Sequence, residues 1–198
     1  MRSRSVCRRG CALRDTPLRV GAGFLLTLAA LYFIGGTDAL CALLLADAVH
    51  ELGHVLALVL TGTEIVSAEL HAAGAVIRCG AFRSDGAEAL CAAAGPFAGI
   101  LAGVTGLLLP WDFCRYTGLV ALCASGFNLL PALPLDGGWL LMLAASCRLD
   151  PPAADTLLRV TGNLCAVGIV LVSAWLHLIV GIAAGIYLAA LVNFPKMR

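Results

Sequence analysis

Residues 39–61 read ALCALLLADAVHELGHVLALVLT, an apolar stretch of membrane-spanning length that contains His50, Glu51 and His54. Residues four positions apart lie on one face of a helix, so the two imidazoles can bind one Zn²⁺. Glu51 can then act as general base towards a water molecule held at the metal. Ionisable side chains inside hydrocarbon are costly and usually functional. The stretch therefore predicts a zinc site on a membrane helix.

The whole chain is apolar in composition. Its 198 residues are 61% hydrophobic and 13% charged, outside the range of soluble domains. A bilayer requires ~20 mainly apolar residues per helix. Six stretches meet this need: 18–34, 39–61, 88–109, 116–147 (long and interrupted), 155–175 and 177–194. We expect an all-α polytopic membrane protein with about six transmembrane helices, organised as a basic cytoplasmic segment over 1–17 and one membrane-embedded domain over 18–198.

Basic residues are distributed unevenly between the two sides of such a six-helix chain. If the N-terminus is cytoplasmic, only Arg115 lies on the outer side. Because basic loops stay in the cytoplasm, this asymmetry favours an even number of spans with both chain ends cytoplasmic. The basic residues then placed on the inner side are Arg2, Arg4, Arg8, Arg9, Arg14, Arg19, Arg78, Arg83, Arg148, Arg159, Lys196 and Arg198.

A more polar segment, residues 63–86, separates the second and third stretches. Two short β-compatible runs, 65–70 and 75–79, flank Gly74, which is the pattern of a β-hairpin. An exposed strand edge there could pair with an extended peptide. A plain amphipathic connector fits the same residues equally well.

A catalytic zinc site needs a third protein ligand. Residues 128–138 read NLLPALPLDGG, whose prolines and glycines break a helix. Broken backbone at membrane depth requires protein or a water-filled cavity around it. Asp136 in this segment and His54 are both expected in the inner half of the bilayer, so Asp136 is the best third ligand. The alternative is a proline-kinked helix whose Asp136 has reached the cytoplasmic interface.

Asp47 is the other carboxylate expected within a span. It lies three residues before His50 and shares its helical face, one turn towards the exterior. There it can orient His50 through the ring nitrogen that does not bind zinc. The competing interpretation, which we favour somewhat, is a carboxylate hydrogen-bonded to a neighbouring helix.

The pairing of HELGH with NLLPALPLDGG resembles the site-2 protease family of intramembrane zinc metalloproteases. Many soluble zinc enzymes share HExxH, whereas the combination in a polytopic chain is highly specific. The resemblance implies that His50, His54 and Asp136 bind one Zn²⁺ and that Glu51 is the catalytic base. It also implies that Asn128 helps to position the substrate.

The resemblance covers residues 39–144. The six-span plan is similar to that of the sporulation branch of the family, which processes a membrane-tethered pro-sigma factor. Members of that branch often carry a C-terminal regulatory domain, which we do not expect here because only residues 195–198 follow the last stretch. Residues 94–99, AGPFAG, resemble a family glycine-proline motif, but Gly99 stands where relatives commonly have asparagine. We expect Gly95 and Gly99 to serve helix packing.

These features imply a zinc metalloendopeptidase of the bacterial cell membrane that hydrolyses a peptide bond within or near a membrane-spanning or membrane-tethered protein. Further expectations are a regulatory membrane partner, a role such as sigma-factor activation, and no nucleic acid among the partners. One rival is a CAAX-type membrane zinc protease, which typically takes its third ligand from a later glutamate; no later span offers one. The other is a catalytically idle protein that uses the metal site for binding or sensing, against which the presence of Glu51 argues.

Overall fold

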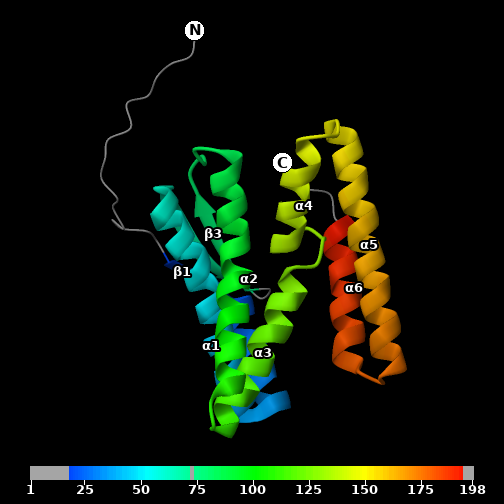
Figure 1. Cartoon of the computed structure of the whole chain (residues 1–198). Coiled ribbons are helices and arrows are strands. Elements are labelled where there is room, and N and C mark those ends of the chain that lie inside the picture. The colour runs from blue at the N-terminus through cyan, green and yellow to red at the C-terminus, as the bar shows by residue number, and fades with distance from the viewer. Residues whose placement is uncertain (1–17, 72–73, 194–198) are drawn as a thin grey trace.

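The computed structural model describes residues 18–71 and 74–193, so the basic segment 1–17 lies outside the described residues. Helices dominate, with one small sheet (Figure 1). The elements are, in chain order, β1 (Leu18–Val20), α1 (Ala22–Thr61), β2 (Ile65–His71), β3 (Gly74–Cys79), α2 (Asp85–Leu108), α3 (Asp112–Asn128), α4 (Asp136–Ser146), α5 (Pro151–Trp175) and α6 (Ile179–Asn193).

Three of the described helices, α1, α2 and α5, are long and apolar enough to cross a membrane. Helix α6 is apolar but has 15 residues. Large apolar side chains project outward, such as Phe33, which is 83% exposed, and Leu108, which is 81% exposed. Soluble monomers rarely expose apolar surface on this scale. The fold is that of a membrane protein, although by helix length alone the described residues give three spans where the sequence predicts six.

Helix α1 contains the first two predicted stretches, joined at Gly36. This glycine has φ 73° and ψ −173°, a conformation that side chains do not tolerate. A straight helix of 40 residues would be about 60 Å long. Yet Gly21, just before α1, donates a backbone hydrogen bond of 2.8 Å to Leu70 in β2. Because the chain from Thr61 to Leu70 extends at most about 32 Å, α1 folds back on itself at Gly36.

The sheet has the order β1-β2-β3. Strands β2 and β3 pair antiparallel, which confirms the predicted hairpin, although its residues 72–73 lie outside the described residues. Strand β1 pairs parallel to β2. Leu18–Val20, which we had placed at the start of the first span, are therefore extended. Within the part of the chain that the structure describes, the outer edge of β3 pairs with no strand.

The helices form two groups (Figure 1). Helices α1, α2 and α3 pack against one another, α5 and α6 form a separate pair, and α4 lies between, in contact with α2 and α5. A buried cluster of Ala132, Ala166 and Leu188 shows that the chain before α4 belongs to the core of the α5–α6 side. That segment therefore connects the two groups.

The interrupted fourth stretch is two helices separated by residues 129–135. A methyl group on Gly137 would overlap the backbone of Leu129, and one on Gly138 would lie 2.5 Å from the carbonyl carbon of Ala132. Glycine at both positions allows the segment to fold back against the start of α4. On its other side, the Thr161 hydroxyl donates a 2.8 Å hydrogen bond to the Pro131 carbonyl. The segment is held from both sides directly before Asp136.

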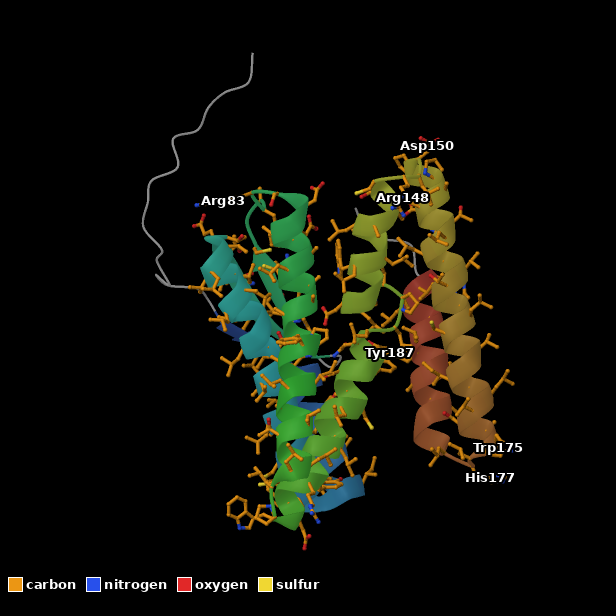
Figure 2. The ribbon with its side chains drawn as sticks, in the orientation of Figure 1. Arg83, Arg148, Asp150, Trp175, His177 and Tyr187 are labelled. Atoms are coloured by element: carbon orange, nitrogen blue, oxygen red, sulfur yellow. The ribbon has the colours of Figure 1, made fainter. Side chains whose placement is uncertain are left out.

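The two ends of the molecule differ in their side chains. Arg83, Arg148 and Asp150 lie at one end, and Trp175 and His177 lie at the opposite end (Figure 2). Helix α2 begins at the end that carries Arg83, because Arg83 precedes its first residue by two positions.

Candidate metal centre

Two imidazoles and a carboxylate from two helices converge at one point. His50 and His54 lie in the second half of α1, and Asp136 is the first residue of α4. The Nε2 atoms of the two histidines are 3.1 Å apart. Asp136 Oδ2 lies 3.1 Å from His50 Nε2 and 3.4 Å from His54 Nε2. The structure thus brings together the three residues that the sequence proposes as ligands.

The hydrogen bond made by His54 determines which of its ring nitrogens carries the proton. Its Nδ1–H donates a 2.7 Å hydrogen bond to the Cys91 carbonyl, which can only accept. In the neutral ring, Nε2 therefore carries a lone pair. An ionised Asp136 also presents only acceptors to this point. Acceptor atoms that converge in this way are stabilised by a cation between them.

The donor set fits zinc. Nitrogen and oxygen ligands with bonds of about 2.0–2.1 Å in a tetrahedral site lie about 3.3 Å apart. The three separations, 3.1, 3.1 and 3.4 Å, match this spacing without rearrangement. Among the described residues, this is the one group of three or more histidine, cysteine or acidic side chains close enough to share a metal ion. A tetrahedral zinc ion held by these three residues would have one position left for a further ligand.

Close approach of α1 to α2 depends on glycines. A methyl group on Gly53 would lie 2.5 Å from the Ala94 carbonyl oxygen, and one on Gly95 would overlap Nε2 of His54. Gly95 therefore makes room for the ring of His54, a specific form of the close helix packing expected from the sequence. The backbone carbonyl of Cys91 also contributes to the site through its hydrogen bond with His54. The sequence does not reveal it, because every residue type has a backbone carbonyl.

Glu51 follows His50 on α1 and is half-buried. It lies within Coulombic range of His54, His50 and Asp136. A carboxylate in this position can exchange protons with a water molecule near the three ligands.

Asp47 is exposed and makes no hydrogen bond to His50 Nδ1, which is buried and has no hydrogen-bond partner in the structure, so the orienting role of Asp47 stays a prediction. The sequence spacing places Asp47 one helical turn before His50. It does not determine which side of the His50 imidazole the carboxylate lies on. Asn128 is the last residue of α3, half-buried, at the start of the segment that leads to Asp136.

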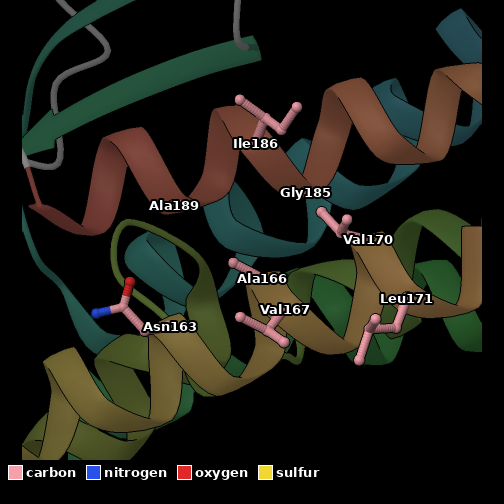
Figure 3. A pocket seen from close by; sticks show the side chains of 8 residues that line it. All are labelled: Asn163, Ala166, Val167, Val170, Leu171, Gly185, Ile186 and Ala189. Atoms are coloured by element: carbon pink, nitrogen blue, oxygen red, sulfur yellow. The ribbon is translucent and has the colours of Figure 1, made fainter. Parts of the chain in front are cut away.

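A cavity of ≈ 240 Å³ lies elsewhere, between α5 and α6 (Figure 3). Its lining is apolar apart from Asn163, with Val167, Val170, Leu171 and Ile186 among the larger side chains. It contains no ionisable group and is separate from the cluster at His50.

Comparisons with known proteins give a structural likeness and no sequence match. No family model matches the chain, and no curated protein matches it. The fold is similar to that of a solved structure, "Site-2 Protease from Methanocaldococcus jannaschii", with a TM-score of 0.69 and 21% sequence identity over 91% of both chains. The chain thus shares the fold of a site-2 protease along nearly its whole length.

Proposed function

We propose that the chain is an intramembrane zinc metalloprotease of the site-2 protease type. The observation that carries this proposal is the meeting of His50, His54 and Asp136, with Glu51 beside them, in a fold similar to that of a site-2 protease. His50, His54 and Asp136 would hold one Zn²⁺. When bound, zinc lowers the pKa of water and polarises a carbonyl group.

The reaction assigned to the site is hydrolysis of a peptide bond. The Glu51 carboxylate takes a proton from the attacking water and delivers it to the nitrogen of the leaving amine. The new C–O bond replaces the broken C–N bond, so Glu51 ends as it began. The Cys91 carbonyl fixes the proton of His54 on Nδ1 and thereby keeps Nε2 available to the metal.

Six membrane passes follow if both halves of α1 cross the bilayer. The fold-back at Gly36 supports two passes there, and α2, α3 with α4, α5 and α6 supply the others. Arg83 and Arg148 mark the cytoplasmic end and Trp175 the outer interface, as basic and aromatic residues commonly do (Figure 2). Both chain ends would then be cytoplasmic, in a bacterial cell membrane.

The substrate class is a membrane-spanning or membrane-tethered protein whose helix unwinds at the cleavage point. The unpaired edge of β3 offers backbone groups to such an extended segment, and Asn128 would help to position it. Processing of a tethered regulator, such as a pro-sigma factor as in the sporulation branch, with a membrane partner controlling access, is the role we assign.

The competing function is a catalytically idle protein that uses the same residues to bind or sense a metal. A metal site of that kind does not require Glu51. A CAAX-type enzyme fits less well, because the third residue beside the histidines is Asp136 and not a glutamate from a later helix.

The decisive comparison is between the wild type and Glu51→Gln. Both would be co-expressed with a panel of tagged single-span membrane proteins, and the cleavage products and zinc content would be measured. We expect the variant to retain zinc and to lose cleavage by at least the 10²- to 10⁴-fold that general-base catalysis contributes.

Glu64→Gln is the matched control, because Glu64 is exposed in the connection between α1 and β2. It should cleave as the wild type does. Cleavage by Glu51→Gln at the wild-type rate would contradict the proposed mechanism. Zinc binding without cleavage of any panel member by the wild type would favour the idle alternative.

A further inference from the structure

The two metal-binding histidines differ in their second ring nitrogen. His54 Nδ1 donates to the Cys91 carbonyl, but His50 Nδ1 is buried and has no hydrogen-bond partner. His50 itself is 7% exposed, so bulk water does not serve this nitrogen. Histidines that bind metals almost always donate the other ring N–H to an acceptor, which fixes the tautomer and the ring orientation. A group that does this for His50 is therefore to be sought among its neighbours.

The neighbour in place is a buried serine. A methyl group on Gly99 of α2 would lie 3.8 Å from His50 Nδ1 and would overlap the Ser125 hydroxyl of α3. The Ser125 hydroxyl thus fills the space where a side chain on Gly99 would begin, a point that lies 3.8 Å from His50 Nδ1. Ser125 is 1% exposed, among the most completely buried polar residues described. Asp47, three residues before His50 on α1, is exposed and makes no hydrogen bond to this nitrogen.

We propose that Ser125 is a positioning residue for the metal site: its Oγ accepts a hydrogen bond from His50 Nδ1–H when zinc is bound. The inference rests on the proposed metal site. A rotation of the serine about χ1, or of the ring as Nε2 settles at bonding distance, closes the remaining gap. The hydroxyl then holds the proton of His50 on Nδ1, as the Cys91 carbonyl does for His54. Gly99 is required because any side chain there would displace the hydroxyl.

The molecule contains a matched control for this arrangement. In the α5–α6 pair, a methyl group on Gly181 would overlap the hydroxyl of Ser173, which is 6% exposed. Both serines are buried against a glycine of another helix. Ser173 is not part of the metal-binding group, so it reports the cost of deleting a buried hydroxyl alone.

The test uses ¹⁵N-histidine-labelled full chain in detergent micelles with zinc, for which only four histidines give signals. Two metal-bound rings should each show a protected Nδ1–H proton in the wild type. In Ser125→Ala, the chemical shift of one of these protons should move to a value typical of a weaker hydrogen bond, and that proton should exchange faster with water. Zinc binding should weaken about 10- to 100-fold. The signal of His54 should be unchanged, as should both signals in Ser173→Ala.

Three results would overturn the inference. One is a wild-type protein that binds zinc but shows a single protected Nδ1–H. Another is Ser125→Ala with both signals and the zinc affinity intact. A third is an equal loss of zinc affinity in Ser173→Ala, which would mean that deletion of any buried hydroxyl has this effect. In each case zinc binding by the wild type leaves the proposed metal site standing, whereas a wild type that binds no zinc would overturn both the metal site and this inference.

Discussion

The α1–α3 group and the α5–α6 pair are built from similar apolar helices but differ in their polar content. In the first group His50 and His54 meet Asp136 at the start of α4, and Gly95 of α2 leaves room for the ring of His54. The second group presents a mainly apolar cavity, with Asn163 hydrogen-bonded across the pair to Asn193 at 2.7 Å. Among the described residues, the one group of side chains that could share a metal ion thus lies where α1 meets α4, separate from the cavity between α5 and α6.

The second group nevertheless affects the site through the segment before Asp136. Ala132 is fully buried against α5 and α6, and Thr161 binds the Pro131 carbonyl. If the proposed metal site is correct, the first group would supply two ligands and the second would help to place the third. Matched variants, one in each group, test this division.

The largest effect is expected from Gly95→Ala in α2. The added methyl group would overlap Nε2 of His54, the atom that faces the other two ligands. Zinc binding should weaken on the order of 100-fold or more, at the upper end of losses seen when groups that orient a ligand are altered, and cleavage should fall with it. The zinc affinity of the variant and of the wild type would be measured by competition with a chelator.

The matched variant is Gly168→Ala in α5, where an added methyl group meets nothing within 4 Å. Because alanine is the better helix former by about 1 kcal/mol, this variant should bind zinc normally and be no less stable. If the two variants lowered zinc affinity equally, the division between the groups would not hold.

A smaller effect is expected from Thr161→Val, which removes the hydroxyl bonded to Pro131 and keeps the side-chain shape. Loss of one such hydrogen bond costs about 1 kcal/mol of stability. If the segment then shifts Asp136, zinc binding should weaken several-fold. Zinc affinity and the thermal midpoint would be measured together.

Thr156→Val is the control for that change, since Thr156 bonds to Pro152 of its own helix and is exposed. A drop in midpoint without a drop in zinc affinity in Thr161→Val would show that α5 supports the fold and not the placement of Asp136.

The sequence predicts which candidate ligands come together better than it predicts the path of the chain. Residues four apart on a helix must share a face, so HELGH predicts two ligands without a structure. The prolines and glycines around Asp136 likewise predict a break, and the helices do stop between Asn128 and Asp136. The β-hairpin follows from its two β-compatible runs around Gly74.

Other features depend on tertiary contacts that leave weak signals. Strand β1 is three residues long, and its pairing with β2 joins residues that are about fifty positions apart, which a short run of sequence does not indicate. The room that Gly95 gives to His54 is visible only when α2 is placed against α1. The spacing of Gly95 and Gly99 indicates a close helix contact but not which side chain uses it.

Binding of one zinc ion by His50, His54 and Asp136 can be checked through the zinc content of the purified full chain. Elemental analysis of the wild type and Asp136→Asn, purified side by side, would give the ratio of zinc to chain. We predict one zinc per chain in the wild type and well below one in the variant, because the amide lacks the charge of the ligand it replaces. A wild type without zinc, or a variant with as much zinc as the wild type, would contradict the account.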